Sequence, residues 1–311
     1  MAKHALVTGG AGFIGSHLAA GLLQDGWQVR ILDNFSTGSR DNLQAIEKSV
    51  EVIDGEVRDA AVCRKACSGI DSVFHLAAIA SVPASIADPA ECHGVTFGGT
   101  LNMLVAARDQ GVRRFVFSSS ASVYGNADTL PTRESQGIQP ESPYASDKAC
   151  GEFYCRNFHS LYGLEAVILR YFNVFGPRQS PTSGYAAVIP RFVQAVTTGA
   201  APVIYGDGLQ TRDFVCVDNV VRANIAASSA EQAAGNAFNI AGGTAVSLHD
   251  VLDVLARISG KSTTPEYMPA RSGEVRHSFA DISAARSRLG YEPLTSLVQG
   301  LEMTMASACG A

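Results

Sequence analysis

The sequence predicts an α/β fold, with a doubly wound parallel sheet and a smaller α/β C-terminal domain. Short apolar runs alternate with helical stretches through the first half of the chain, and this alternation is typical of parallel strands joined by helical crossovers. A glycine-rich turn separates the first apolar run from the first helical stretch, as in the opening crossover of such folds.

In chain order, the apolar runs predict strands and the longer amphipathic stretches between them predict helices. Strands are expected at residues 5–7, 29–32, 50–53, 72–76, 114–118 and 166–169, and helices at residues 12–24, 60–67, 96–109 and 144–162. Because each strand is followed by a helix, the strands should be parallel and their carboxyl ends should share one edge of the sheet.

The pattern changes after Asn173, where Gly176-Pro177 interrupts the chain and a polar loop follows. We expect a helix at 189–198 and a strand at 203–205, and buried strands near Val215 and at 238–240. The sequence therefore predicts a first domain at 1–173 and a second at 174–311, with segments near 215–243 returning to the first domain.

Composition argues against several classes of protein. The chain has 311 residues, with 24 Lys and Arg against 29 Asp and Glu, and a net charge of −5. Nucleic acid is not an expected partner, because phosphate binding needs a basic face. No apolar run reaches 18 residues and the N-terminus lacks the apolar core of a signal peptide, so no membrane association is expected.

Seven cysteines without regular spacing suit a reducing, cytoplasmic setting. Cys63 with Cys67 and Cys150 with Cys155 have no histidine partners nearby. Zinc sites use tighter Cys/His clusters, so these cysteines are interpreted as buried structural thiols and no metal is expected.

The residues from Thr8 to Gly15 carry a dinucleotide-binding pattern. Gly9, Gly12 and Gly15 form G-x-x-G-x-x-G between a strand and a helix, with Phe13 and Ile14 at the start of that helix. Glycines allow a tight turn and close approach of the backbone to a pyrophosphate, and the helix N-terminus adds free N–H groups. This context, rather than the glycines alone, predicts a Rossmann cofactor site.

Asp33 follows the second strand, 18 residues after Gly15. A carboxylate at this point accepts the ribose hydroxyls and repels a 2′-phosphate, which favours NAD over NADP. The alternative is a turn residue, because Asp33-Asn34 is also a good turn pair. Further cofactor contacts are expected from residues that follow strands, namely Asn34, Glu56, Val57, Leu76, Ala77 and Ala78.

Tyr144 and Lys148 are four residues apart, on one face of a predicted helix. A nearby ammonium should lower the pKa of the tyrosine, so that Tyr144 acts as a general base. Ser120 ends a parallel strand and should face the same crevice, where it can share the substrate proton. These three residues form the candidate catalytic set.

With these motifs in place, the whole chain resembles the extended short-chain dehydrogenase/reductase family, and within it the UDP-hexose 4-epimerases. The motifs that carry the resemblance are Thr8 to Gly15, Asp33-Asn34, His75 to Ala78, Ser118 to Gly125, Tyr144 with Lys148, Arg170 to Pro177, Gly206 to Gly208, Thr211 to Phe214 and Arg271 to Glu274. The resemblance also places Ser118 and Tyr171 at the cofactor.

The residues after Ser120 argue for epimerisation within that family. Related dehydratases carry an acidic pair there and related decarboxylases carry a Glu, whereas this chain reads Ala121-Ser122-Val123-Tyr124. The implied reaction removes the proton of the sugar 4-hydroxyl through Tyr144 and passes a hydride to tightly bound NAD. The 4-keto sugar then turns over and is reduced on its other face.

The resemblance also implies substrate contacts. Asn173, Arg212 and Arg271 would hold the diphosphate, because a guanidinium suits phosphate oxygens. Val188, Ile204 and Tyr205 would line the uracil pocket, Glu274 would bind the uridine ribose, and Ser122 would lie near the sugar. Ser278 matches a position where a large aromatic side chain would exclude an N-acetyl group. A serine leaves space, which favours UDP-N-acetylglucosamine and UDP-N-acetylgalactosamine.

Alternatives remain open at this point. The same catalytic set suits UDP-glucose or UDP-glucuronate. A dehydrogenase that releases its cofactor is a further reading, and so is a non-catalytic NAD-sensing protein, although the latter would be expected to have lost Tyr144 or Lys148. Many relatives form homodimers through helices equivalent to 98–110 and 144–162, whose apolar residues also suit an internal core. The implied setting is cytoplasmic polysaccharide biosynthesis.

Overall fold

The computed structural model describes residues 3–127, 129–181, 187–261, 264–270 and 275–310. Its central feature is a parallel sheet of seven strands in the order β11-β6-β5-β4-β1-β2-β3. The strands are β1 His4–Thr8, β2 Gln28–Asp33, β3 Val50–Asp54, β4 Ser72–His75, β5 Arg114–Ser120, β6 Glu165–Tyr171 and β11 Ala237–Ile240. The strand order reverses between β1 and β4, which confirms the doubly wound fold.

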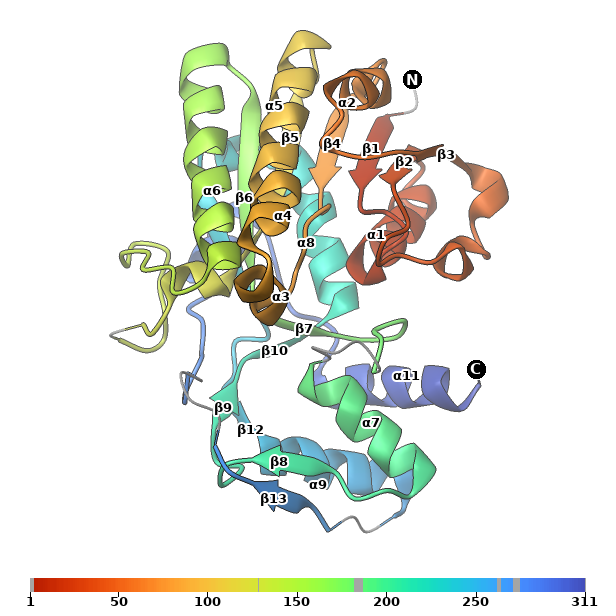
Figure 1. Cartoon of the computed structure of the whole chain (residues 1–311), viewed down its shortest axis with the longest axis vertical. Coiled ribbons are helices and arrows are strands. Elements are labelled where there is room, and N and C mark those ends of the chain that lie inside the picture. The colour runs from red at the N-terminus through yellow and green to blue at the C-terminus, as the bar shows by residue number, and fades with distance from the viewer. Residues whose placement is uncertain (1–2, 128, 182–186, 262–263, 271–274, 311) are drawn as a thin grey trace.

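Helices cover both faces of this sheet (Figure 1). Helices α2 Ala60–Cys67, α5 Gly99–Asp109 and α6 Pro143–Tyr162 lie on one face, and α1 Phe13–Gln24, α8 Val217–Ser229 and α10 Ser283–Leu289 lie on the other. Successive strand residues feed opposite cores: Phe115 and Phe117 pack under α5 and α6, whereas Val116 packs toward α1 and α8. This burial on both faces explains why the strands read as continuous apolar runs.

Two short helices, α3 Val82–Ala87 and α4 Pro89–His93, follow β4. A π-helical segment, η3 Gly94–Gly98, joins α4 to α5. The sequence did not predict α3 and α4, and it predicted a single helix over 96–109. Short 3₁₀ turns lie at η1 Arg40–Leu43, η2 Glu47–Ser49, η4 Ala121–Tyr124 and η5 Glu231–Ala233.

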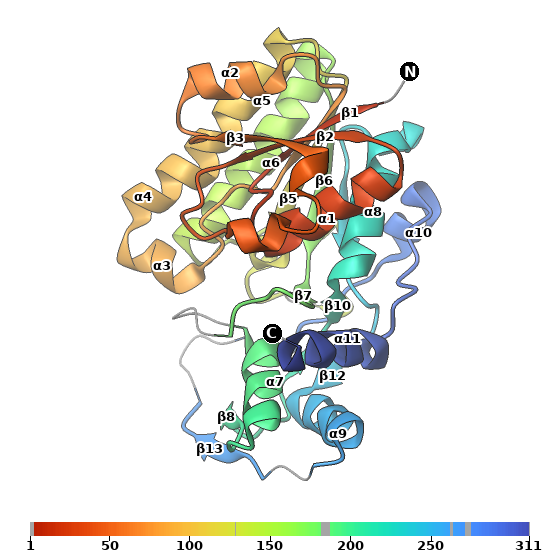
Figure 2. The ribbon, with the colours of Figure 1, turned by 90° about the vertical axis from the view of Figure 1, so that its right-hand side faces the viewer.

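A second layer of structure lies beyond the carboxyl ends of the strands (Figure 2). It contains helices α7 Val188–Thr198, α9 Leu248–Ser259 and α11 Leu297–Cys309, and the pairs β7 Asn173–Phe175 with β10 Phe214–Cys216, β9 Thr211–Arg212 with β12 Val246–Ser247, and β8 Val203–Tyr205 with β13 Glu266–Met268. Its own core includes Ile189, Phe192, Val251, Leu255 and Leu301. The second layer therefore lies opposite the edge of the main sheet at which the cofactor motifs end.

The chain crosses between the two layers more than once. The strand expected near Val215 is present as β10, but it pairs with β7 and not with the main sheet. The strand expected at 238–240 is β11, which pairs with β6 and so extends the main sheet. The division into domains at residue 173 stays a prediction.

The start of α6 is set by local sequence. The Ser142 hydroxyl accepts a hydrogen bond from the backbone of Ala145, and Pro143 occupies the first helical turn, where its missing N–H is not needed. Gly163, at φ 73°, ends the helix in the left-handed conformation. Tyr144 therefore lies in the first turn of α6, beside the carboxyl end of β5.

Candidate active site

The glycine-rich turn leaves no room for side chains. Gly9 has φ 67°, and a Cβ there would lie 2.9 Å from the backbone nitrogen of Ala77. A Cβ on Gly15 would lie 2.1 Å from the carbonyl oxygen of Gly9. Gly12 precedes α1, and Phe13 and Ile14 form its first turn, whose N–H groups have no helical acceptor. This cradle fits the pyrophosphate of a dinucleotide.

Asp33 is buried at the end of β2. One carboxylate oxygen accepts a 2.8 Å hydrogen bond from the backbone of Ala11, and the other accepts one of 2.8 Å from Phe35. Asp33 thus fixes both the glycine-rich turn and its own loop, in line with the alternative reading as a turn residue. Each oxygen keeps a second lone pair, so the expected ribose contact remains compatible with this geometry.

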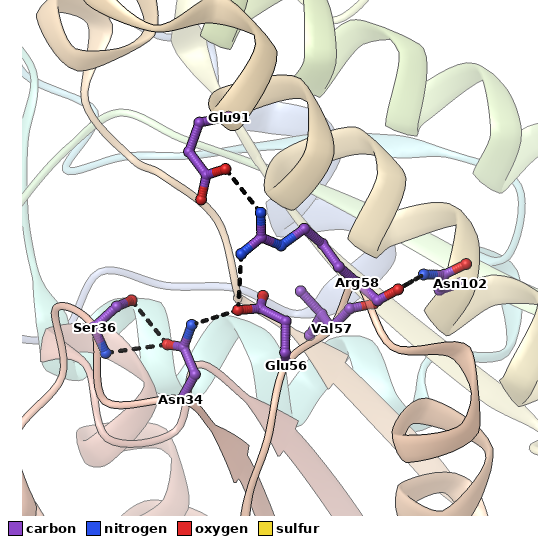
Figure 3. A network of polar contacts seen from close by, with 7 residues as sticks. All are labelled: Asn34, Ser36, Glu56, Val57, Arg58, Glu91 and Asn102. Atoms are coloured by element: carbon purple, nitrogen blue, oxygen red, sulfur yellow. Dashed lines mark hydrogen bonds and ion pairs between the residues drawn. The ribbon is translucent and has the colours of Figure 1, made fainter.

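Asn34 and Glu56 belong to a polar network beside this loop (Figure 3). The Glu56 carboxylate accepts hydrogen bonds from Asn34 at 2.9 Å and from Arg58 at 3.2 Å, and Arg58 also pairs with Glu91 at 2.7 Å. Partial burial acts to raise the pKa of Glu56, but these bonds lower it overall. Val57 is buried, and its carbonyl accepts from Asn102.

A buried chain of hydrogen bonds, which we call the relay, runs from Thr8 through His75 to Thr100 and fixes the start of the segment Leu76 to Ala78. The sequence did not predict it. The Thr8 hydroxyl accepts from the backbones of Leu76 and Ala77, each at 3.2 Å, and therefore donates to His75 Nδ1 at 2.7 Å. Thr100 donates to the carbonyl of Thr96, so it accepts from His75 Nε2 at 3.0 Å. The neutral Nε2–H tautomer of His75 satisfies this relay.

This relay makes stability depend on pH. Burial lowers the pKa of His75 to about 3. Between pH 6.5 and 3 the unfolded chain therefore binds a proton that the folded protein does not, and the free energy of unfolding should fall as pH falls, by at most about 1.4 kcal/mol per pH unit. Urea unfolding at several pH values measures this slope. A His75→Gln variant with an unchanged slope would contradict the assignment.

Ser120, Tyr144 and Lys148 lie together at the carboxyl end of β5. The Ser120 side chain acts on the Tyr144 hydroxyl and favours its ionised form. Lys148 Nζ lies 5.9 Å from the centre of the Tyr144 ring and donates a 2.7 Å hydrogen bond to the carbonyl of Ser118. Lys148 is buried and Tyr144 is half-buried. The geometry places a hydroxyl, a phenol and an ammonium at one edge of the sheet.

The expected lowering of the Tyr144 pKa is not seen. Burial raises the pKa of Tyr144 to about 12, and the Ser120 side chain offsets only part of this effect. The prediction was wrong because Lys148 directs its ammonium to Ser118, and because burial also lowers the pKa of Lys148 itself, to about 8. Bound NAD supplies a hydride acceptor and, while oxidised, a positive charge that favours the phenolate.

Ser118 and Tyr171, both expected at the cofactor, are buried and bonded to each other. Their hydroxyls lie 2.9 Å apart, and the Tyr171 hydroxyl also contacts Asn224 of α8. Their side chains therefore join β5, β6 and α8. Any contact with a cofactor would come from their backbone, and Asn224 is a residue that sequence reasoning missed.

A cavity of about 400 Å³ lies in the second layer. Four predicted substrate residues line it, namely Asn173, Val188, Tyr205 and Arg212. Ile204 does not line it: along β8 the neighbours Val203 and Tyr205 face the cavity, whereas Ile204 is fully buried in the core on the other side. The sequence also missed several lining residues, including Phe175, Arg191, Phe192, Gln210, Phe214 and Leu248.

The remaining predicted residues lie in different places. Ser278 is half-buried, and its backbone donates to the carbonyl of Thr211 at 3.1 Å, next to Arg212. Ser122 is in η4, its backbone donates to the Ser120 hydroxyl at 3.2 Å, and its own hydroxyl is buried without a partner in the described part of the chain. Arg271 and Glu274 lie outside the described residues.

Two further findings concern metals and membranes. The described ranges contain no group of three or more His, Cys, Asp or Glu residues that could hold a metal ion. Within the same ranges, no helix has the length and apolarity needed to cross a membrane.

Cys63, Cys67 and Cys155 are buried as free thiols, whereas Cys150 is exposed, contrary to expectation.

Comparisons with known proteins agree with this geometry. The NAD dependent epimerase/dehydratase family matches residues 5–241. A UDP-glucose 4-epimerase of Mycolicibacterium smegmatis is 39% identical over 309 residues, covering 96% of each chain.

Two solved structures are also similar over 99% of both chains. One is a UDP-N-acetylglucosamine 4-epimerase from Methanobrevibacter ruminantium in complex with UDP-N-acetylmuramic acid, with a TM-score of 0.95 and 38% identity. The other is a UDP-glucuronic acid 4-epimerase from Bacillus cereus in complex with UDP-glucuronic acid and NAD, with a TM-score of 0.91 and 34% identity. With the glycine-rich cradle and the serine, tyrosine and lysine at the sheet edge, these matches show that the chain belongs to the NAD dependent epimerase/dehydratase family.

Proposed function

We propose that this protein is a UDP-hexose 4-epimerase that keeps NAD bound and acts on UDP-N-acetylglucosamine and UDP-N-acetylgalactosamine. The observation that carries the proposal is the grouping of Ser120, Tyr144 and Lys148 at the carboxyl end of β5, in a chain that also has the glycine-rich cradle and the cavity that Asn173 lines. An acid/base group between a hydride acceptor and a substrate pocket suits reversible oxidation at one carbon. Relatives named as 4-epimerases support this choice.

In the proposed mechanism, Tyr144 takes the proton of the sugar 4-hydroxyl while Ser120 shares that hydrogen bond. Lys148 stabilises the phenolate through its positive charge. NAD supplies the acceptor and later the donor of the hydride. After the 4-keto sugar has turned about its diphosphate, Tyr144 returns the proton on the opposite face. Arg212 and Asn173, which line the cavity, would hold the diphosphate during that rotation.

The preference for an N-acetylated sugar rests on Ser278. Its hydroxymethyl side chain leaves room that an aromatic ring would fill. UDP-glucose and UDP-glucuronate remain the competing substrates, because relatives with those names are similar along the whole chain. A non-catalytic NAD-sensing protein is disfavoured because the complete catalytic set is retained.

An NMR time course with separate UDP-N-acetylglucosamine and UDP-glucose, without added NAD, tests the proposal. We expect the first substrate to be converted to its 4-epimer faster than the second, because the pocket admits the acetamido group. Conversion of UDP-glucose alone would keep the mechanism and reject the pocket argument. A Ser278→Tyr variant should lose conversion of the N-acetylated sugar and keep that of UDP-glucose. No conversion of either sugar, or of UDP-glucuronate, even with NAD supplied, would reject the epimerase.

We further propose a cytoplasmic homodimer that serves polysaccharide biosynthesis. Helix α6 supports the dimer, because three of its apolar or aromatic residues, Phe153, Leu161 and Tyr162, are about half exposed or more. Exposed apolar side chains grouped on one helix are typical of an interface. Sedimentation at twice the monomer mass of 32.6 kDa would support this assembly.

A further inference from the structure

Lys148 is a cation in a place that disfavours charge. Its side chain is 3% exposed, and the carbonyl of Ser118 is the partner of its ammonium among the described residues. The ring of Phe117, 5.0 Å away, adds a weak attraction. Burial lowers the pKa of Lys148 to about 8. Burial therefore works against the positive charge that the proposed mechanism needs on Lys148.

Most titratable groups that face Lys148 carry no free negative charge. Glu152 accepts two hydrogen bonds from Arg170, at 2.8 and 2.6 Å, so its charge is offset. Burial raises the pKa of the Cys92 and Cys155 thiols, which keeps them neutral. His75 is neutral because burial lowers its pKa, and burial raises the pKa of Tyr144.

Asp147 differs from these groups. It precedes Lys148 on α6, and its side chain is 7% exposed. One carboxylate oxygen lies 2.8 Å from His93 Nδ1 of α4, and the other is buried without a partner in the described ranges. His93 is largely exposed and is no permanent cation. Asp147 is therefore a buried carboxylate next to Lys148 that no arginine or lysine pairs among the described residues.

We propose that Asp147 is a positioning residue that keeps Lys148 protonated, and that His93 holds Asp147 in place. A negative charge nearby favours the charged form of a lysine. Asp147 and Lys148 are consecutive, buried residues of α6, so little solvent screens the attraction between a carboxylate and an ammonium there. The significance of Lys148 rests on the proposed function, but its state of charge can be measured without any substrate.

The direct test is NMR of the holoenzyme labelled at the lysine ε-carbons, since the chain has five lysines, Lys3, Lys48, Lys65, Lys148 and Lys261. A Lys148→Met variant assigns the signal. In Asp147→Asn, which keeps the shape and loses the charge, the midpoint of the Lys148 titration should fall by about one pH unit. Asp147→Ser serves as a second neutral variant if the first does not fold.

Glu91→Gln is the matched control, because Glu91 is a carboxylate of the same helix as His93 but pairs with Arg58. Glu91→Gln should leave the midpoint of the Lys148 titration unchanged. In Asp147→Glu the midpoint should return most of the way to its value in the unaltered protein. The alkaline limb of kcat/KM with the preferred UDP-sugar should move to lower pH with the lysine signal. An equal midpoint in Asp147→Asn and the unaltered protein, both folded, would overturn the proposal even if epimerisation is confirmed.

Discussion

Replacing Tyr144 with phenylalanine should slow 4-epimerisation by roughly 10²–10⁴-fold, the usual contribution of a positioned general base. The variant removes the hydroxyl on which the Ser120 side chain acts. It keeps the ring, so packing in the first turn of α6 should not change. The rate of interconversion followed by NMR, with thermal unfolding of both proteins, measures the effect.

Tyr154→Phe is the matched control for that experiment. Tyr154 lies on the same helix, but it is partly exposed and packs against Phe97. We expect an unchanged rate. A Tyr144→Phe variant that is folded and still within tenfold of the original rate would show that another group carries the proton. Ser120 would then be the first candidate, because its side chain acts on the phenol.

The sequence predicted the succession of strands and helices along the chain because each signal was local. Strands that are buried on both faces have continuous apolar sequences. A glycine pattern of this spacing between a strand and a helix indicates a dinucleotide-binding turn. The same applies to Tyr144 and Lys148, whose four-residue spacing places them on one helical face. Their approach to Ser120 followed from the rule that parallel strands end at one edge.

Other features depend on contacts between distant residues, which no local pattern records. The relay from Thr8 through His75 to Thr100 joins β1, β4 and α5, with partners up to 67 residues apart. The Tyr144 pKa was predicted from a sequence neighbour, whereas burial by the whole fold decides it. Ile204 was assigned to the cavity by motif position, although strand alternation at β8 turns it away.

The buried pair of Glu152 and Arg170 is the second place where a large effect is expected. Both side chains are almost fully buried, and they share two hydrogen bonds. Ser119 also donates to Glu152 at 2.6 Å, and Arg170 donates to the hydroxyl of Tyr124 at 2.7 Å. The pair therefore joins α6 to β6, and through Ser119 it also contacts the end of β5, one residue before Ser120.

Arg170→Met should lower the free energy of unfolding by about 3–5 kcal/mol, because it removes the two short bonds to the buried charge of Glu152 and leaves it Ser119 and the more distant Arg156. Urea unfolding measures this loss. Removing both charges with Glu152→Leu and Arg170→Met should recover much of it, since desolvation of the pair nearly cancels its attraction. Arg113→Ala, which breaks an exposed pair with Glu165, should cost at most about 1 kcal/mol.

The double variant separates stability from function at this position. If Glu152 and Arg170 only fill space, the double variant should epimerise its substrate at the original rate once it is folded. The bond from Ser119 to Glu152 argues otherwise, because its loss frees the end of β5 just before Ser120. A folded double variant with a lower kcat and an unchanged KM would show that the pair positions the end of β5, and with it Ser120. An unchanged kcat would limit its role to folding.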